Sequence, residues 1–153
     1  MPDTAVKTLT LKALRKASDA IAMVEASLTT TAPYDPSVTY TAKEREPYDA
    51  LSDRFIRAVE VSVRFFRSYE RLMYAENSDT YRDLLNRMEK LGIISSTAKW
   101  IDMREVRNRI VHDYLPAELK GLYDDLMGDL GDELKRLQQQ LASRRSHVAD
   151  LSN

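Results

Sequence analysis

The chain of 153 residues has the length of one domain and is too short for two well-formed hydrophobic cores. It contains no cysteine, which excludes disulfides, thiolate metal sites and cysteine nucleophiles. Its formal net charge of −1 argues against broad electrostatic capture of nucleic acid, so any contact with RNA requires a local basic cluster.

Two further absences narrow the class of protein. The sequence has 2 histidines, too few for a histidine-based metal site with three or more ligands. No apolar run approaches the length of a membrane span, and the N-terminus lacks a basic-then-apolar signal pattern. We therefore expect a cytoplasmic protein with no membrane segment, no metal and no cofactor.

Apolar residues recur at helical spacing almost throughout, and no alternating run is long enough for a strand. A first helix is predicted over about residues 9–29. Residues 30–46 carry prolines and many hydroxyls, which predict a loop, and Pro47 suits the first turn of a second helix over about 47–76. The expected core positions of these two helices are Leu14, Ala17, Ile21, Val24, Leu28, Leu51, Phe55, Val59, Ser62, Phe66, Tyr69 and Met73.

The polar segment Asn77-Ser78-Asp79 interrupts this pattern, and Ser78 or Asp79 can cap a third helix over 80–91 that Gly92 ends. A fourth helix is predicted from near residues 95–97 to about Tyr114. It ends there because Pro116 disfavours the helical conformation at Leu115.

A last helix is predicted over 117–146, with two glycines as candidate bends and frayed residues at 147–153. These glycines are Gly128 and Gly131, and the leucines of its buried face are Leu119, Leu122, Leu126, Leu130, Leu134, Leu137 and Leu141. The sequence thus predicts one all-α domain over 1–153, an antiparallel bundle of four to five helices.

The fourth helix places an arginine on its apolar side. At about 100° per residue, Arg107 lies in the same arc as the apolar residues of this helix. A desolvated guanidinium must be paired, so Arg107 either belongs to a site, pairs with a carboxylate such as Glu60, or extends to the surface. The apolar arc itself is formed by Met103, Val106, Ile110 and Tyr114.

His112 follows Arg107 by five residues, which is about 140° around an ideal helix. The two side chains can cooperate only if the helix unwinds near its end, which Pro116 favours, or if a second subunit supplies one of them. Asn108 lies one turn before His112 and can orient the imidazole. Alternatively, His112 caps the helix C-terminus, the commoner role of a lone histidine there.

The segment RNRIVHDY, residues 107–114, resembles the R-x4-H-x-Y motif of the HEPN superfamily, specifically the toxin member of HEPN–MNT toxin–antitoxin pairs. Arg107, Asn108, His112 and Tyr114 match the motif residue by residue. Arg54 and Glu60, in the second helix, resemble less distinctive positions of the family. The resemblance covers about residues 47–140 and is strong only over 103–115.

This resemblance implies a homodimeric endoribonuclease of HEPN-like fold that cuts RNA without a metal and leaves a 2′,3′-cyclic phosphate. Arg107 would bind the phosphate, His112 would transfer protons, and Asn108 would orient the imidazole or the substrate. Tyr114 would accept AMP from a partner nucleotidyltransferase that neutralises the toxin, although a core role for this tyrosine stays open. Supporting or RNA-binding roles would fall to Arg54, Glu60, Arg104 and Arg109.

Additional positive charge comes from the second helix, where four arginines form a loose basic side or a solvated face with ion pairs. These are Arg57, Arg64, Arg67 and Arg71. Two other functions stay open. One is a non-catalytic substrate-binding or regulatory subunit of a nucleotidyltransferase, and the other is a helical bundle without any site.

Overall fold

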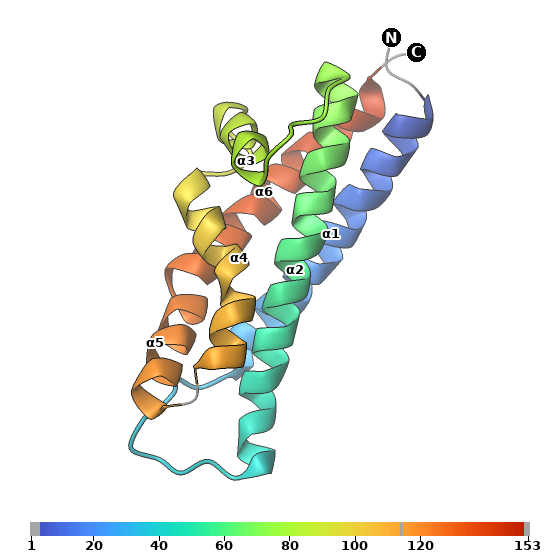
Figure 1. Ribbon diagram of the computed structural model, residues 1–153. Coiled ribbons are helices and arrows are strands. Elements are labelled where there is room, and N and C mark those ends of the chain that lie inside the picture. The colour runs from blue at the N-terminus through green and yellow to red at the C-terminus, as the bar shows by residue number, and fades with distance from the viewer. Residues whose placement is uncertain (1–3, 114, 152–153) are drawn as a thin grey trace.

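The computed structural model describes residues 4–113 and 115–151, which form six helices and no strand (Figure 1). The long α1 (Thr4–Thr30) and α2 (Ala42–Tyr74) run antiparallel and pack closely, and α6 (Asp129–Asp150) covers α1. The shorter α3 (Tyr81–Lys90), α4 (Thr97–His112) and α5 (Pro116–Met127) complete the bundle. The all-α prediction is confirmed.

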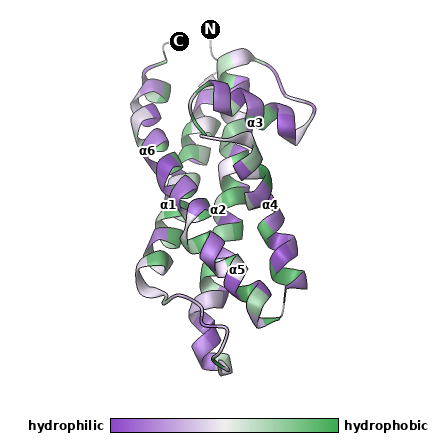
Figure 2. Cartoon of the chain, turned by 90° about the vertical axis from the view of Figure 1, so that its left-hand side faces the viewer, coloured by the Kyte–Doolittle hydropathy of each residue, from purple (hydrophilic) through white to green (hydrophobic). Residues whose placement is uncertain are grey.

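The buried faces agree with the predicted helical stripes. The predicted positions of α2 are buried, apart from the exposed Met73 near its end. The seven leucines of the last predicted helix are also buried. Purple and green bands alternate along the helices, as expected for helices with one buried face (Figure 2). Within the described residues, no helix combines the length and apolarity that crossing a membrane requires.

The predicted start of the second helix at Pro47 is wrong. A capping box begins α2 five residues earlier: the Thr41 hydroxyl accepts from the Glu44 amide at 3.2 Å, and the Glu44 carboxylate accepts from the Thr41 amide at 3.1 Å. Pro47 lies within the helix. The reciprocal hydrogen bonds therefore decide the boundary, and the proline is accommodated in the second turn.

The connection between α1 and α2 is shorter than predicted and is held by tyrosines. Tyr34 stacks on Tyr40 with ring centroids 4.9 Å apart, and it meets Tyr123 of α5 at 5.4 Å. Tyr48 of α2 donates its hydroxyl hydrogen to the Ala32 carbonyl at 2.7 Å. Aromatic packing between the loop, α2 and α5 thus fixes a segment that contains many hydroxyl groups.

Thr80, rather than Ser78 or Asp79, caps α3 by accepting from the Asp83 amide at 3.0 Å. Ser78 instead donates its amide to the buried Glu70 carboxylate at 2.7 Å. At the other end, Gly92 adopts φ +76°, the left-handed conformation expected just after a helix C-terminus.

A buried carboxylate on α6 holds the N-terminal end of α4. Glu133 is 1% exposed and accepts from the Ser95 amide at 3.0 Å and from the Trp100 indole at 2.9 Å. Arg136 also contacts this carboxylate. Ser96 caps α4 through the Lys99 amide at 3.2 Å. The start of α4 is therefore fixed against the core.

The single last helix predicted for 117–146 is interrupted at Gly128, which separates α5 from α6. A Cβ added at Gly131 would lie 2.3 Å from the Leu126 carbonyl oxygen, so only glycine permits this close approach. The two predicted bending glycines thus mark a break between two helices, which accounts for the sixth helix.

Candidate functional site

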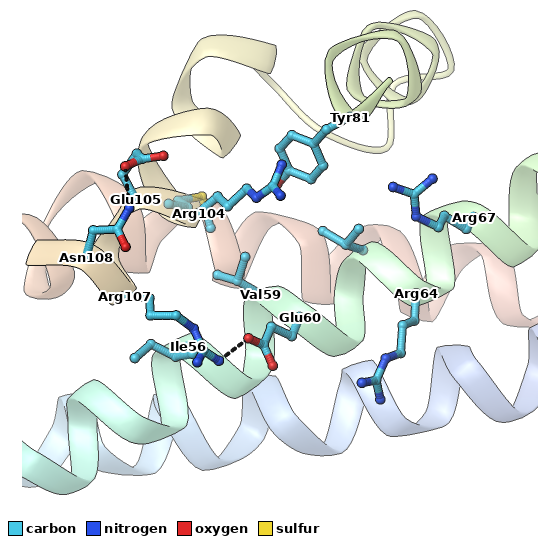
Figure 3. Close-up of a pocket in the computed structure, with 12 residues that line it drawn as sticks. Ile56, Val59, Glu60, Arg64, Arg67, Tyr81, Arg104, Glu105, Arg107 and Asn108 are labelled. Atoms are coloured by element: carbon cyan, nitrogen blue, oxygen red, sulfur yellow. Dashed lines mark hydrogen bonds and ion pairs between the residues drawn. The ribbon is translucent and has the colours of Figure 1, made fainter. Parts of the chain in front are cut away.

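A cavity of about 690 Å³ opens between α2, α3 and α4 (Figure 3). Its volume lies in the usual range for ligand pockets, about 300–1,000 Å³. Ile56, Val59, Val63 and Met103 supply its apolar surface. Its polar lining consists of Glu60, Arg64, Arg67, Tyr81, Arg104, Glu105, Arg107 and Asn108. Four arginines against two glutamates make this a local basic site in a chain of net charge −1.

Arg107 lies at the wall of this cavity and forms an ion pair with Glu60 of α2. Its side chain is 58% exposed and that of Glu60 49%, so Arg107 is not desolvated, and of the stated alternatives the structure forms the pair with Glu60. Met103 and Val106 form the buried contact of α4, and Arg107 lies beside them at the open edge. Such an exposed pair contributes only about 0–1 kcal/mol, so a phosphate can replace Glu60 at small cost.

Asn108 also lines the cavity, and its amide donates to the Glu105 carboxylate at 2.9 Å. Both residues belong to α4, so this bond runs along the helix. The predicted contact from Asn108 to the imidazole of His112 is not formed in the single chain. Arg107 and Asn108 are therefore brought together at one wall, each with a carboxylate as its present partner.

His112 is the last residue of α4, is exposed, and does not line the cavity. Among the described residues it has no hydrogen-bond or ion-pair partner. The Asp113 amide still donates to the Arg109 carbonyl at 2.6 Å, and the backbone leaves the helical conformation only at Asp113. Of the two alternatives, unwinding near the helix end therefore does not extend back to His112, and one chain keeps Arg107 and His112 on different sides of a regular helix.

A family model described as Ribonuclease HepT-like matches residues 13–141, which is more than half of the chain. The chain belongs to the ribonuclease HepT-like family. The match spans all of α2, α3, α4 and α5, and so includes the whole cavity and the residues of the motif. No curated protein and no solved structure matches the chain significantly.

Two arginines that were expected to support the site, Arg54 and Arg109, connect helices of this HepT-like chain outside the cavity. Arg109 pairs with Asp125 of α5 at 2.8 Å and with Asp113 at 3.7 Å. Arg54 donates to the Ser27 hydroxyl of α1 at 2.8 Å. Their contacts within the chain are therefore structural, whereas Glu60 and Arg104 lie in the cavity.

The expected modification site, Tyr114, lies outside the described residues. The residues around it leave apolar surface open: Val111 is 72% exposed and Leu115 is 50% exposed. Val111 directly precedes the exposed His112 at the end of α4, and Leu115 directly precedes α5. Exposed apolar side chains near a chain segment with polar groups are typical of a surface that contacts another molecule.

Of the four arginines of the predicted basic side, two line the cavity and two lie outside it. Arg64 and Arg67 line it, whereas Arg57 is outside and pairs with Asp53 at 3.1 Å, and Arg71 is also outside. Sequence analysis did not single out Tyr81, which points into the site from the first turn of α3. The only local signal was an aromatic residue directly after the capping Thr80, because the arginines around it come from other helices.

No group of three or more histidine or acidic side chains among the described residues is arranged to hold a metal ion. The polar groups that line the cavity of this HepT-like chain are four guanidinium groups, two carboxylates, an amide and a phenol. Burial raises the pKa of Tyr81 to about 12, with Arg104 and Arg67 acting in the opposite direction. The phenol stays neutral and hydrogen-bonds as a donor at physiological pH.

Proposed function

We propose that the chain is a metal-independent endoribonuclease, the toxin of a HEPN–MNT toxin–antitoxin pair, and that it acts as a homodimer. The observation that carries this proposal is the concentration of four arginines, Arg107 among them, around the cavity that Asn108 also lines. A guanidinium group binds phosphate oxygens through two parallel hydrogen bonds. Membership of a ribonuclease family supports RNA as the phosphate-bearing substrate.

In the proposed reaction, the imidazole of His112 takes the proton of a ribose 2′-hydroxyl. The 2′-oxygen attacks the adjacent phosphorus, the bond from phosphorus to the 5′-oxygen breaks, and an imidazolium protonates that leaving oxygen. Arg107 exchanges Glu60 for the phosphate and stabilises the charge that develops on its oxygens. The products are a 2′,3′-cyclic phosphate and a free 5′-hydroxyl.

The dimer completes this site because Arg107 and His112 cannot meet on one regular helix. A symmetric dimer in which the ends of α4 adjoin would bring His112 of one chain to the Arg107 wall of the other. Two observations favour contact at this end: the exposure of Val111 and Leu115, and the absence of an internal partner for His112 among the described residues.

The test of the ribonuclease proposal is cleavage of single-stranded RNA by purified protein in excess EDTA. We expect cleavage at an undiminished rate, with fragments that carry 2′,3′-cyclic phosphate ends detectable by mass spectrometry. Activity that appears only after a divalent metal is added would contradict the mechanism. So would products with 3′-hydroxyl ends.

Tyr114 is the proposed site at which the partner nucleotidyltransferase attaches AMP. Tyr114 follows His112 by two residues in the sequence, and the attached AMP would act by blocking access to the imidazole. We expect co-expression with the partner to add AMP to Tyr114 and relieve growth arrest, whereas Tyr114→Phe should stay unmodified and toxic. Peptide mass spectrometry and colony counts measure the two effects, and equal rescue of both chains would exclude this role.

A non-catalytic subunit of a nucleotidyltransferase is the second candidate. It is favoured by the internal pairing of Arg107 with Glu60 and of Asn108 with Glu105, which leaves both groups already satisfied. Such a subunit would bind its partner protein but leave RNA intact under every condition of the EDTA experiment. The two functions are therefore separated by the same assay.

A further inference from the structure

Tyr81 carries an aromatic ring into the cavity from a fixed position. It is the first residue of α3, directly after the capping Thr80, and its hydroxyl donates to the Trp100 carbonyl at 3.4 Å. The ring is half-buried against the core and reaches the cavity from the α3 side (Figure 3). The anchored hydroxyl end and capped helix leave the ring little freedom to move.

The guanidinium of Arg104, on α4, lies over this ring with its central carbon 4.4 Å from the ring centroid. No carboxylate among the described residues forms an ion pair with Arg104, nor with Arg67, which points toward the same side of the cavity from α2. The side of the Arg104 guanidinium that faces Tyr81 is occupied by the ring, whereas its other side and its N–H donors have no ionic partner in the described part of the chain. Arg64, about one turn before Arg67 in α2, is likewise without an ionic partner in the described part of the chain, but its guanidinium points away from Tyr81, toward α1 (Figure 3).

A second tyrosine–arginine pair in the same chain provides a comparison, because its arginine is held in place by ion pairs. Arg87 lies 4.5 Å from the ring centroid of the exposed Tyr74, but outside the cavity. Its guanidinium is already bonded to Glu70 at 3.2 Å and to Glu76 at 3.0 Å. The pair at Tyr81 has a similar centroid distance, but its arginine forms no ion pair with a described carboxylate and it faces a cavity. Ion pairs that hold the arginine in place therefore do not account for it.

We propose that Tyr81 and Arg104 form a binding subsite for one nucleobase of single-stranded RNA, which stacks on the Tyr81–Arg104 pair while Arg67 binds an adjoining phosphate. The proposal rests on the proposed ribonuclease function. It adds Tyr81 as a residue that positions the RNA strand in the cavity. Aromatic rings and guanidinium planes are the surfaces on which proteins stack unpaired bases. Arg107, at the opposite end of the cavity, would then meet a phosphate of the same strand.

The subsite makes single-stranded RNA the substrate class, since a base held in a duplex cannot stack on a side chain. It is tested with 2′-O-methyl RNA oligonucleotides, which lack the attacking hydroxyl and stay intact. Each carries one 2-aminopurine at successive positions. We expect wild-type protein to quench the fluorescence strongly at one position, and Tyr81→Phe to retain this quenching.

Tyr81→Leu, which removes the ring, should lose that quenching and bind the oligonucleotide about tenfold or more weakly. Arg104→Lys, which keeps the charge and loses the planar group, should also lose quenching. Tyr74→Leu is the matched control and should change neither reading. Thermal unfolding of each variant separates a local effect from loss of the fold, and Tyr81→Phe supplies a folded comparison.

Equal binding and quenching by Tyr81→Leu and Tyr74→Leu would overturn the subsite while leaving the ribonuclease proposal intact. Loss of the dimer in Tyr81→Leu, measured by sedimentation, with unchanged RNA quenching would assign the cavity to a second protein chain and also overturn it. A wild-type protein that neither binds nor cleaves any RNA would remove the ribonuclease function itself. These three outcomes are distinguishable in one set of measurements.

Discussion

Replacing His112 with alanine is expected to lower RNA cleavage by about 10²–10⁴-fold, the usual contribution of a general acid–base group. The substitution removes the proposed proton-transfer group and leaves Arg107 and the cavity in place. His112 is exposed and unpartnered among the described residues, so the midpoint of thermal unfolding should stay that of the wild-type protein. The rate is measured with excess enzyme over a labelled RNA in EDTA.

His147 provides the matched control, because it is the other histidine of the chain and lies exposed in the last turn of α6. His147→Ala should cleave RNA at the wild-type rate. Full activity of His112→Ala, or equal losses in the two variants, would exclude His112 from the chemistry. RNA binding should persist in His112→Ala, since the arginines of the cavity are untouched.

Mixing two inactive variants is expected to restore cleavage. In a dimer that joins Arg107 of one chain to His112 of the other, an Arg107→Ala chain paired with a His112→Ala chain has one site with both groups intact. Random association of equal amounts gives mixed dimers as about half of the total, so the mixture should show about a quarter of wild-type activity. Each variant alone should remain inactive under the same conditions.

The complementary mixture combines wild-type protein with the double variant Arg107→Ala/His112→Ala. If the site is shared between chains, every site of a mixed dimer lacks one group, and activity should be about a quarter of the wild-type value. If each chain carries its own complete site, the value is about half, and the two single variants fail to restore each other. Native mass spectrometry of the mixtures verifies that mixed dimers form.

Most of the fold was predictable because helical periodicity reports burial directly. The α2 stripe from Leu51 to Tyr69 and the leucines of α5 and α6 are buried as predicted. The error at the start of α2 has a physical cause. Pro47 alone favours a first turn at that position, whereas the hydrogen bonds between Thr41 and Glu44 stabilise an earlier start and the helix tolerates the proline.

The side of α4 on which Arg107 lies was predicted less well. A helical wheel measures angle alone, and Arg107 is angularly close to Met103 and Val106, which are buried. Whether that edge is covered depends on how α4 crosses α2, which a single helix does not determine. The pairing with Glu60 was among the alternatives because the second helix offered a carboxylate, and the structure forms it.

The cavity itself was beyond sequence reasoning because its residues come from three helices. Arg64 and Arg67 are ordinary basic positions of an amphipathic helix. They line one cavity with Tyr81 and Arg104 only because α2, α3 and α4 pack together. The motif at 107–114 indicated a family, and the family match agrees with it. Within one chain, however, the motif holds Arg107 and His112 apart, although the proposed chemistry requires them together.

Because α4 stays helical through His112, RNA cleavage should depend steeply on the concentration of the protein. If a complete site exists only between two chains, a lone folded chain is inert. Below the dissociation constant of the dimer, the number of sites then rises with the square of the chain concentration. A threefold rise in expression would multiply cleavage about ninefold in that range. Low background synthesis of the protein would then be harmless to the host, whereas a modest rise in its expression would bring RNA cleavage to a toxic level.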